Sequence, residues 1–505
     1  MNIFKKMGRV IRQQPLYLLL LPFFFVFHGF TVNYGLISLQ DALILLVTYM
    51  ATTGVVYVLI WLFYRNRSRA ALLTTLLLFF YFFFGTLYDF LETHIKWLHR
   101  YSIVLSVLLV LVIGMAGYLR KNKKEYTKAT FFLNILLLIY LLVDAAGLVK
   151  KIIFPEPEKF SVYSSGNEDI YKPCNDCSNP DIYFLVFDEY TSSVNLSETF
   201  HYDNSLFDSL LTDRGFYLAL HSYSNYHFTP FSVASILNMN YVNGIENISS
   251  ISGQDYLNVE RLIKNNKVIN FLSARQYDVV NYSIFDLAGN PSPVEVSLLP
   301  VKTKLITEQT LLSRAMRDIG WRLNTGRFQL KSLAGNPLYN NLNINNKLLE
   351  LVKSAPAKST GKPRFIYVHF EMPHWPFYFD NQSRLRNQAV LAAEFTGVHI
   401  ASYTAYIAYT NSKIMEIIDA VQSNPQRPAA IVIMGDHGYR AHLDNIPDNH
   451  FFKNLNAVYL PGKDYHLLKD TISGVNQFRL VFNTLFKQSL PLLKDSTVFL
   501  KDKIK

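Results

Sequence analysis

The sequence of 505 residues contains only two cysteines, Cys174 and Cys177, within the short run CNDC. One pair cannot complete an all-cysteine tetrahedral zinc site, which needs four thiolates. In an oxidising compartment the pair is a candidate for a small local disulfide. We therefore expect a structural or incidental role for the cysteines, so the chemistry of the chain must come from other residue types.

Beyond its first third the chain also lacks an excess of either charge. Residues 1–154 hold 16 Lys and Arg against 5 Asp and Glu, a difference that equals the net charge of +11 of the whole chain. The remaining residues are therefore neutral overall. A neutral domain has no excess of positive charge with which to bind a nucleic-acid backbone. This argues against DNA or RNA as a partner and assigns the basic excess to the first part.

The first part has long hydrophobic runs instead. Half of all residues are hydrophobic, and a helix of about 20 such residues crosses a hydrocarbon layer about 30 Å thick. Five stretches fit this description: residues 15–31, 41–63, 70–91, 101–119 and 129–149. The first follows several cations and is open to interpretation as a signal peptide, but no small-residue cleavage pattern follows it and four further stretches do.

The distribution of cations predicts the orientation of these spans. Lys and Arg are concentrated before the first stretch, at residues 65–69 and at residues 120–128. These are alternate loops, and the positive-inside rule places them in the cytoplasm. With the amino terminus inside, five spans carry everything after Lys151 to the other side. We therefore expect an integral membrane protein with a five-span transmembrane domain at 1–151, a linker at 152–180 and an extracytoplasmic domain at 181–505.

From residue 181 the pattern of apolar residues changes from long stretches to short runs. Short apolar runs rich in aromatic and β-branched residues occur at 181–187, 365–370 and 429–435, and each is followed by polar residues. Helix-length segments lie between them, for example 402–421. Alternating strands and helices predict an α/β domain whose mainly parallel sheet is covered by helices on both faces. Ligand sites in such sheets lie at the carboxyl ends of the strands.

Acidic residues and a histidine follow two of these strands. Asp188 and Glu189 come after the first, and Asp436 and His437 come after the last. Carboxylate oxygens and imidazole nitrogens at one sheet edge are suitable ligands for a divalent cation. Whether Asp188 or Glu189 is the ligand stays open. A second interpretation of Asp188 is that it caps the helix that follows.

A threonine precedes a proline at the start of a predicted helix. Pro230 suits the first helical position, which makes Thr229 the N-cap of a helix that carries Val233 and Ile236 on its apolar side. Capping is one explanation of this threonine. The other uses the same position: a hydroxyl at a helix amino terminus lies in positive potential, and contact with a metal lowers its pKa enough to form an alkoxide nucleophile.

Several histidines are candidates for handling a substrate or a proton. His374 lies between Pro373 and Pro376 just after the second strand, where it could donate a proton to a leaving oxygen or bind a phosphate. His369 lies inside that strand, and we expect it to be a packed core residue. His450 is a further candidate for a substrate group, and His442 competes with it.

The ordered set of motifs resembles the alkaline phosphatase and sulfatase superfamily over residues 181 to about 500. The motifs are an apolar strand ending in Asp, T-x-x-S-x-A-S-x-L, H-x-P-F and an apolar strand ending in DHG. The segments DIYFLVFDEYTSS, SNYHFTPFSVASILNM, FEMPHWPFYFD and IVIMGDHGY resemble, more closely, bacterial membrane-bound sulfatase-like hydrolases and transferases. The arrangement of five spans followed by such a domain is similar to that of lipoteichoic acid synthases and lipid A phosphoethanolamine transferases.

The resemblance implies roles for individual residues. It makes Asp188, Thr229, Asp436 and His437 the ligands of one or two divalent metal ions, with Thr229 also the nucleophile. Zinc is the first candidate, manganese the next, and calcium and magnesium are further ones. It also makes His374 and His450 the groups that hold the transferred phosphate, with His374 as a catalytic residue.

The chain departs from the family pattern at two positions. In sulfatases the position of Thr229 holds a Cys or Ser that is oxidised to formylglycine, with an Arg four residues later, where this chain has Val233. Threonine is not a substrate for that oxidation, so sulfate-ester hydrolysis is not expected. Asp188 stands where the transferases usually have Glu, which leaves the identity of the metal open.

The resemblance thus implies a phosphotransferase of a bacterial inner membrane with a periplasmic or extracellular catalytic domain. It would move a phospholipid head group, of the phosphoethanolamine or phosphoglycerol type, through a phospho-threonine to a cell-envelope glycan or lipid. Two alternatives stay open: a phosphodiesterase, phosphatase or sulfatase-like hydrolase in which water accepts the group, and a non-catalytic membrane assembly protein.

Overall fold

In the computed structural model the chain forms two compact units. The first unit is Met1–Pro157 with Ser297–Leu330, and the second is Glu158–Val296 with Lys331–Lys505. The structure describes residues 2–35, 37–95, 100–122, 126–154, 159–162, 171–174, 176–247, 250–294, 303–318, 337–358, 361–395, 397–423, 427–443 and 446–501.

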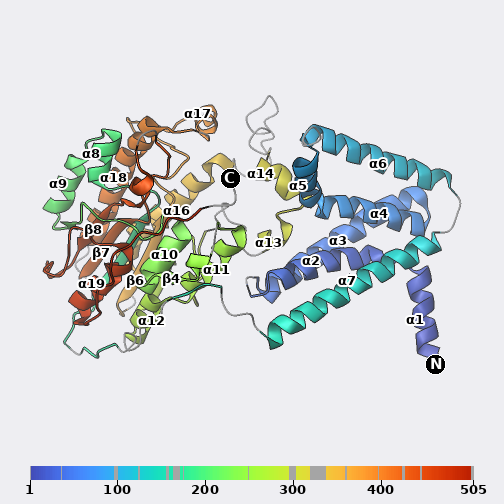
Figure 1. Cartoon of the computed structure of the whole chain (residues 1–505), viewed down its shortest axis with the longest axis horizontal. Helices are drawn as coiled ribbons and strands as arrows, with labels where there is room; N and C mark the ends of the chain where they lie inside the picture. The colour runs from blue at the N-terminus through green and yellow to red at the C-terminus, as the bar shows by residue number, and fades with distance from the viewer. Residues whose placement is uncertain are drawn as a thin grey trace. The chain divides into compact units, whose positions relative to one another are not determined.

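Helices occupy all the predicted apolar stretches of the first unit, and the stretch 70–91 is divided between two of them (Figure 1). The helices are α1 (Asn2–Gln13), α2 (Tyr17–Val32), α3 (Leu39–Tyr64), α4 (Arg67–Phe82), α5 (Phe84–His94), α6 (Tyr101–Lys121) and α7 (Thr127–Ile153). Helices α3, α6 and α7 are long and apolar enough to cross a membrane, and α4 and α5 qualify together as a pair bent by 61°. Helix α2 is apolar but has 16 residues. The described residues thus provide three to four candidate spans, and the count of five and the orientation stay predictions.

The long helices leave most of their apolar side chains uncovered. In the most apolar windows of α3, α6 and α7, only 6%, 11% and 11% of the residues are buried. Large side chains such as Val47 and Leu142 are exposed. An apolar surface of this extent marks a membrane or protein contact, so the first unit is suited to a lipid environment.

A segment from the second half of the chain packs within the first unit. Helices α13 (Lys304–Thr307) and α14 (Leu311–Asp318) contact α2 and the α4–α5 pair (Figure 1). The approach is close at Gly85, whose backbone N–H donates to the carbonyl of Gln309 at 2.8 Å and where any side chain would collide with that residue. Arg314 of α14 forms an ion pair with Asp89 of α5 and lies over the ring of Tyr88. Residues 303–318 therefore brace the bent helix pair.

The second unit is built on a six-stranded sheet in the order β3-β8-β7-β2-β6-β5. The strands are β2 (Asp181–Phe187), β3 (Tyr217–Leu218), β5 (Asp278–Tyr282), β6 (Arg364–Phe370), β7 (Ala429–Gly435) and β8 (Asn456–Tyr459). The neighbours β7, β2, β6 and β5 are parallel, and β8 runs antiparallel to both β7 and β3. A separate antiparallel pair joins β1 (Ser161–Val162) and β4 (Val242–Asn243). The predicted sheet is confirmed as mainly parallel.

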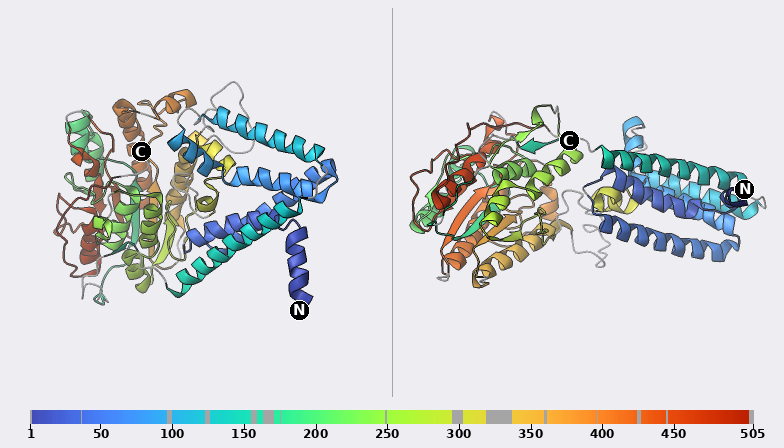
Figure 2. Two further views of the ribbon diagram at one scale, coloured as in Figure 1. Left: turned by 45° about the vertical axis from the view of Figure 1, so that its right-hand side comes forward. Right: turned by 90° about the horizontal axis from the view of Figure 1, so that it is seen from below.

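Helices cover both faces of this sheet (Figure 2). The helices of the second unit are α8 (Ser193–Phe200), α9 (Ser205–Asp213), α10 (Thr229–Asn238), α11 (Gly253–Lys264), α12 (Lys267–Ala274), α16 (Asn340–Ser354), α17 (Gln388–Ala393), α18 (Ile400–Gln422) and α19 (Gly474–Phe486). Alternate residues of β2, such as Leu185, belong to one apolar cluster with α8, α9, α16 and α18. Phe184 points to the other face and packs edge-on against Phe478 of α19. This coverage of both faces explains why β2 and β6 are mostly apolar between their charged first residues and their ends.

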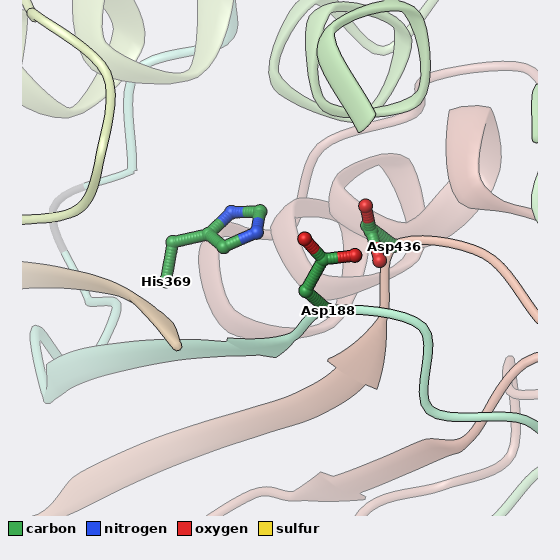
Figure 3. A group of neighbouring side chains, drawn as sticks. All are labelled: Asp188, His369 and Asp436. Carbon is green, nitrogen blue, oxygen red and sulfur yellow. The ribbon is translucent and has the colours of Figure 1, made fainter. Parts of the chain in front are cut away.

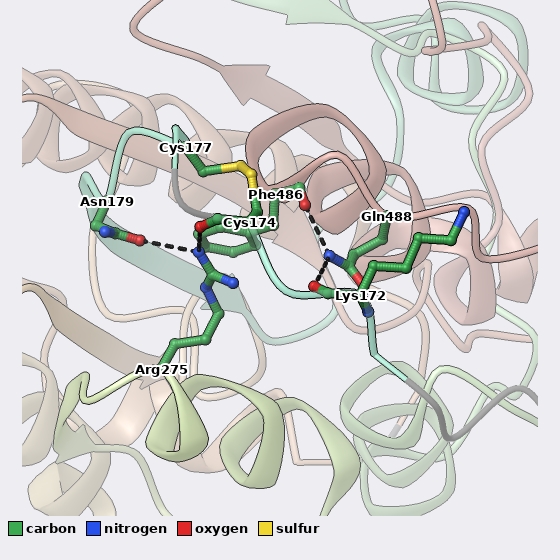
Figure 4. Close-up of a disulfide and its surroundings, with 7 residues drawn as sticks. All are labelled: Lys172, Cys174, Cys177, Asn179, Arg275, Phe486 and Gln488. Atoms are coloured by element: carbon green, nitrogen blue, oxygen red, sulfur yellow. Dashed lines mark hydrogen bonds between the residues drawn. A yellow bond between two sulfur atoms is a disulfide. The ribbon is translucent and has the colours of Figure 1, made fainter.

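The candidate disulfide is present in the structure. Cys174 and Cys177 are bonded, with their Cα atoms 5.6 Å apart (Figure 4). Arg275, just after α12, donates to the carbonyl of Cys174 at 3.4 Å, and the Gln488 side chain donates to the carbonyl of Lys172 at 3.0 Å. These contacts join the segment that precedes β2 to the residues that follow α12 and α19. The cysteines therefore have a structural role.

A buried ion pair joins the amino ends of the two central strands. The guanidinium of Arg364 donates to Asp181 at 2.6 Å and to the carbonyls of Ala355 and Lys358 at 2.7 Å, and both members of the pair are buried. We expect Asp181→Asn to lower the free energy of unfolding of the second unit by about 3–5 kcal/mol, because it leaves a buried charge without its partner.

Hydrogen exchange of the β2 and β6 amides, measured by mass spectrometry on the detergent-purified protein, tests this expectation. Asp419→Asn is the matched control, since Asp419 pairs with Arg214 at 2.9 Å but is 61% exposed. An exposed pair contributes about 0–1 kcal/mol. Equal protection of β2 and β6 in the two variants would show that the buried pair contributes no more than the surface pair.

Candidate metal centre and nucleophile

The carboxyl ends of β2, β6 and β7 bring three polar side chains together. Phe187 at the end of β2 is aligned with Phe370 of β6 and with Gly435 of β7. The candidate ligand atoms of Asp188, His369 and Asp436 all lie within 4.8 Å of one another, and all three residues are buried (Figure 3). The predicted location of the site, just beyond the strands, therefore matches where the structure gathers these groups.

This cluster has polar atoms that the described part of the chain does not satisfy. Oδ1 of Asp188, Oδ2 of Asp436 and Nε2 of His369 are buried without a hydrogen-bond partner among the described residues. Burial, and then the neighbouring charge of Asp436, raise the pKa of Asp188 well above its ordinary value. Isolated buried carboxylates are costly, and a divalent cation removes this cost. Two carboxylates and an imidazole fit zinc or manganese.

Asp436 is held so that one of its oxygens stays available. Its Oδ1 accepts the backbone N–H groups of Glu189 at 3.0 Å and of His437 at 2.9 Å. Two such bonds fix the carboxylate, which lies beside Asp188 (Figure 3), and leave Oδ2 without a hydrogen-bond partner among the described residues. Outer contacts of this kind orient metal ligands.

His437 connects the cluster to Thr229. Its Nε2 lies 3.2 Å from the Thr229 hydroxyl, 3.3 Å from Asp436 Oδ2 and 3.5 Å from Asp188 Oδ1. Its Nδ1 lies 2.8 Å from the carbonyl of Gly438, so the tautomer with a proton on Nδ1 directs the Nε2 lone pair at the cluster. Burial, with a contribution from Arg440, lowers the pKa of His437 to about 3. The ring is therefore neutral near pH 7, as a metal ligand must be.

The structure decides against the capping interpretations of two residues. Helix α10 begins at Thr229, its N-cap is Phe228, and no side chain caps it. The Thr229 hydroxyl contacts His437 instead. Likewise, the N-cap of α8 is Ser192, whose side chain accepts from the Asn195 N–H, so Asp188 caps no helix. Both residues have their functional groups at the cluster rather than at a helix end.

Asp188 and Glu189 have different partners in the structure, and only Asp188 lies in the cluster with His369 and Asp436. The Glu189 carboxylate accepts the backbone N–H of Arg440 at 2.9 Å, and its Oε2 lies 3.9 Å from His374 Nε2. Its backbone is in the left-handed region with φ 64°, and its carbonyl accepts from the Tyr403 hydroxyl at 2.7 Å. The Glu189 carboxylate is thus engaged by Arg440 and His374, which favours Asp188 as the acid that contributes to the cluster.

The predicted substrate histidines differ in their surroundings. His374 is partly exposed, with Nδ1 2.6 Å from the Trp375 carbonyl and Nε2 near Glu189. His450 is buried, and its two ring nitrogens lie 2.9 Å and 3.0 Å from the carbonyls of Pro447 and Ala441. His442 is exposed and pairs with Asp448 at 2.9 Å. His374 is therefore the best placed of the three to meet a ligand.

Two further residues belong to the site although the sequence did not reveal them. His369 was expected to be a core residue, and it is fully buried, but its Nε2 faces Asp188 and Asp436. Its pKa falls to about 4 because of burial, so it too is a neutral imidazole. Glu371 is buried with Oε1 unbonded by any described residue, and burial raises its pKa to about 7. Both stand within one residue of the end of β6, the signal that could have found them.

Comparison with known proteins identifies the family. A family model described as Sulfatase matches residues 187–469, more than half of the chain. The chain belongs to the sulfatase family. This confirms the resemblance drawn from the motifs and the predicted α/β fold class. The match begins at the last residue of β2 and includes Asp188, Thr229, His369, Asp436 and His437.

Solved structures similar to the chain include phosphoethanolamine transferase domains and sulfatases. The C-terminal periplasmic domain of EptC from Escherichia coli is 11% identical, with 68% of this chain and 95% of that chain covered and a TM-score of 0.41. The corresponding domain of the phosphoethanolamine transferase EptC from Campylobacter jejuni is 13% identical, covers 64% and 94%, and has a TM-score of 0.34. A putative sulfatase from Bacteroides fragilis, yidJ, is 12% identical, covers 64% and 78%, and has a TM-score of 0.38. No curated protein matches the chain.

The sulfatase family is metal-dependent, and the cluster described above fits that property. The unsatisfied atoms of Asp188, Asp436 and His369 provide two anionic oxygens and one neutral nitrogen. Which metal binds is not fixed by these three donors, since both zinc and manganese accept them.

Proposed function

We propose that the chain is a membrane-anchored, metal-dependent phosphotransferase. It moves a phospholipid head group of the phosphoethanolamine or phosphoglycerol type, by way of a phospho-threonine, to a cell-envelope glycan or lipid. The observation that carries this proposal is the position of the Thr229 hydroxyl, 3.2 Å from His437 Nε2 at the edge of the Asp188–Asp436 cluster. A threonine, which is not a precursor of formylglycine, favours phosphoryl over sulfuryl transfer.

The ligands in this proposal are Asp188, Thr229, Asp436 and His437, with His369 as an added candidate. Zinc is the first choice, manganese the second, and calcium and magnesium remain further candidates. When bound, the cation would neutralise the carboxylates and lower the pKa of the Thr229 hydroxyl. His437 is a poor general base, because its pKa is lowered to about 3, so its lone pair serves better as a ligand than as a proton acceptor.

The chain's own residues have distinct roles in the reaction. Thr229 Oγ1 forms a bond to the phosphorus of the donor as the bond from phosphorus to the diacylglycerol oxygen breaks. His374, partly exposed beside the cluster, gives a proton to that leaving oxygen. The hydroxyl of the acceptor then gives its proton to His374 and attacks the same phosphorus as the bond from phosphorus to Thr229 Oγ1 breaks, which releases Thr229 as the alkoxide and restores the protonated His374. His374 is the proposed group that holds the phosphate between the two steps. His450 was the second candidate from the sequence, but it is buried and both of its ring nitrogens already face backbone carbonyls, so it has no part in this mechanism.

A membrane anchor suits a lipid donor. The apolar helices of the first unit keep the second unit attached to the bilayer that contains the donor, which raises the effective concentration of donor at the site. We therefore place the chain in a bacterial inner membrane with its catalytic unit on the periplasmic side.

Product analysis distinguishes transfer from hydrolysis. Detergent-purified protein is incubated with a phospholipid labelled in its head group and with an envelope glycan or lipid extract. We expect the label to appear covalently bound to the acceptor. Label released only as a free head-group phosphate would favour a hydrolase, and no turnover together with no bound metal would favour a non-catalytic assembly protein.

A further inference from the structure

The connection between β5 and β6 is longer than a parallel crossover requires. The two strands are adjacent and parallel, and helix α16 alone can return the chain from one to the start of the other. The chain nevertheless enters the first unit at residue 297 and returns to the second at residue 331. Loops at the carboxyl ends of strands carry function in α/β proteins. Residues 303–318, which we call the docked segment, are therefore a candidate for a functional role.

Both ends of this insertion adjoin the candidate metal centre. In the loop that follows β5, the ring of Phe285 lies edge-on to the ring of His369, with 5.7 Å between the ring centres. On the returning side, Asn345 of α16 accepts the backbone N–H of Glu371 at 2.8 Å. His369 and Glu371 stand on either side of the last residue of β6. The insertion thus departs and returns beside the strand end that contributes to the cluster.

The departing loop is held in place by hydrogen bonds. The side chain of Asn281 donates to the carbonyls of Phe285 and Asn290, each at 2.8 Å. Lys347 of α16 donates to the carbonyl of Pro293 at 2.7 Å. Eight residues separate the last described residue of this loop from the docked segment. A connection of that length limits how far a fixed loop and an anchored segment can separate.

A buried isoleucine anchors the docked segment in the first unit. Ile306 of α13 is 5% exposed and belongs to one apolar cluster with Phe25 of α2, Phe82 of α4 and Leu137 of α7 (Figure 1). Helix α2 has a glycine at the point of approach, and a Cβ added to Gly29 would lie 2.7 Å from the Ile306 side chain. The segment is therefore packed into the apolar interior of this unit.

The docked segment has a second anchor on α5. The Gly85 backbone N–H donates to the carbonyl of Gln309 at 2.8 Å, and a Cβ added to Gly85 would lie 2.9 Å from the Cα of Gln309. Arg314 is buried, pairs with Asp89 and lies over the ring of Tyr88, 5.4 Å from its centre. Two separate helices thus lack a side chain at the points where the same segment passes.

The ion pair also completes the membrane unit. Asp89 belongs to the α4–α5 pair, which is apolar enough to cross a membrane, and the docked segment contacts both of these helices. An ionisable side chain in such a position requires a partner. Arg314 supplies it from a part of the chain that begins and ends in the second unit.

We propose that residues 303–318 are a positioning element, which restrains the catalytic unit on the membrane unit and so directs the enzyme to phosphate esters of bilayer lipids in preference to those in solution. The chain then joins the two units at three places, after residues 157, 296 and 330. An additional anchored connection narrows the range of positions of the catalytic unit and raises the effective concentration of its site at the bilayer. The substrate class in this inference rests on the proposed function, while the restraint does not require turnover.

Distances between the two units test the restraint without turnover. The two native cysteines are bonded to each other, so spin labels can be attached at Leu142→Cys in α7 and Leu206→Cys in α9, where the native side chains are 69% and 75% exposed. Double electron–electron resonance of the full chain in lipid nanodiscs reports the distribution of distances between the labels. We expect a narrow distribution in the labelled chain and a wider one when Gly85→Leu is added, because the new side chain meets the backbone of Gln309.

A control variant and a second disrupting variant accompany this measurement. Gly54→Leu in α3 is the matched control, because a Cβ added there meets no atom within 4 Å. Arg314→Glu places a like charge beside Asp89 and leaves the glycines unchanged. Hydrogen exchange of the docked segment shows whether it is released, and that of β2 shows whether the catalytic unit is folded. We expect both disrupting variants, and not the control, to lose protection in the docked segment alone.

Two phosphodiesters separate bilayer lipids from esters in solution. One is a phospholipid labelled in its head group within the nanodisc, and the other is a soluble chromogenic phosphodiester. Gly85→Leu is expected to lower turnover of the bilayer phospholipid about tenfold or more. Turnover of the soluble ester should stay unchanged, because Thr229 and the candidate metal ligands are untouched. Gly54→Leu should change neither rate.

The outcomes separate this inference from the proposed function. If Gly85→Leu widens the distances but wild type turns over neither ester, the phosphotransferase proposal and the preference for bilayer lipids fail, and the restraint stands. If wild type turns over the lipid and a variant with a released segment keeps the narrow distances, the restraint is wrong. Wider distances with full lipid turnover would show that the restraint does not select the substrate.

The docked state itself is open to direct contradiction. Rapid hydrogen exchange of residues 303–318 in the wild-type chain would overturn the inference. Should Gly85→Leu fail to fold or keep the segment docked, Arg314→Glu decides by the same distance and turnover measurements.

Discussion

Replacement of Thr229 by alanine is expected to lower turnover of the phospholipid donor by at least about a thousandfold, because the hydroxyl forms the covalent intermediate and its loss removes the whole covalent route. The fold should tolerate the change, since α10 has no side-chain cap. Thr229→Ser keeps a hydroxyl at the same position and should retain measurable activity. Turnover of labelled phospholipid in detergent, with the thermal midpoint recorded alongside, measures both effects.

Mass spectrometry of acid-quenched reactions provides the second readout. The peptide that contains Thr229 should gain the mass of the head-group phosphate in wild type and not in Thr229→Ala. Ser235→Ala is the matched control, because Ser235 is a buried hydroxyl of the same helix whose Oγ donates to the carbonyl of Ser232. Full turnover by Thr229→Ala, or an adduct that persists in that variant, would refute the threonine mechanism.

Removal of the metal is expected to lower the thermal midpoint of the second unit, and zinc or manganese should restore it. A cation stabilises the buried, unsatisfied oxygens of Asp188 and Asp436 in their ionised form. A cation at about a thousand times its dissociation constant adds about 4 kcal/mol. Thermal unfolding of the full chain with chelator and with each metal measures this, and Asp188→Asn should remove the response while the exposed Asp419→Asn keeps it.

The pH dependence of the chelated protein provides an internal check on the same group. Burial, and then Asp436, raise the pKa of Asp188 in the folded state. The folded protein therefore holds this proton more tightly than the unfolded chain does. The resulting stabilisation is complete below the ordinary pKa of about 4 and is lost as pH rises through the raised pKa. Chelated Asp188→Asn should gain stability over chelated wild type as the pH increases, and an equal difference at all pH values would contradict the assignment.

Much of the second unit could be predicted because its strands are buried on both faces. The runs that became β2, β6 and β7 are predominantly apolar, and such runs mark the centre of a parallel sheet. Their carboxyl ends then located Asp188 and Asp436. The same property prevented prediction of the role of His369. A strand covered on both faces shows no alternation of polar and apolar residues, so the sequence does not indicate which face the histidine is on.

Contacts between distant segments were beyond prediction from one sequence. Residues 303–318 pack against α2 and the α4–α5 pair through a few side chains, among them Ile306 and Arg314, and so short a segment has too few apolar positions to reveal its partner. The bend of the third predicted span coincides with this contact at Gly85. Arg440 lies in a loop, and its place beside Phe228 depends on the folded chain.

The account depends on one cation shared by Asp188, Asp436, His437 and Thr229. Anomalous diffraction from crystals of the full chain grown with zinc, recorded on both sides of the zinc absorption edge, tests this most directly. The account predicts an anomalous peak about 2.0–2.2 Å from oxygen or nitrogen atoms of these four side chains. An anomalous map with no peak there, or with zinc bound only at other residues, would contradict it.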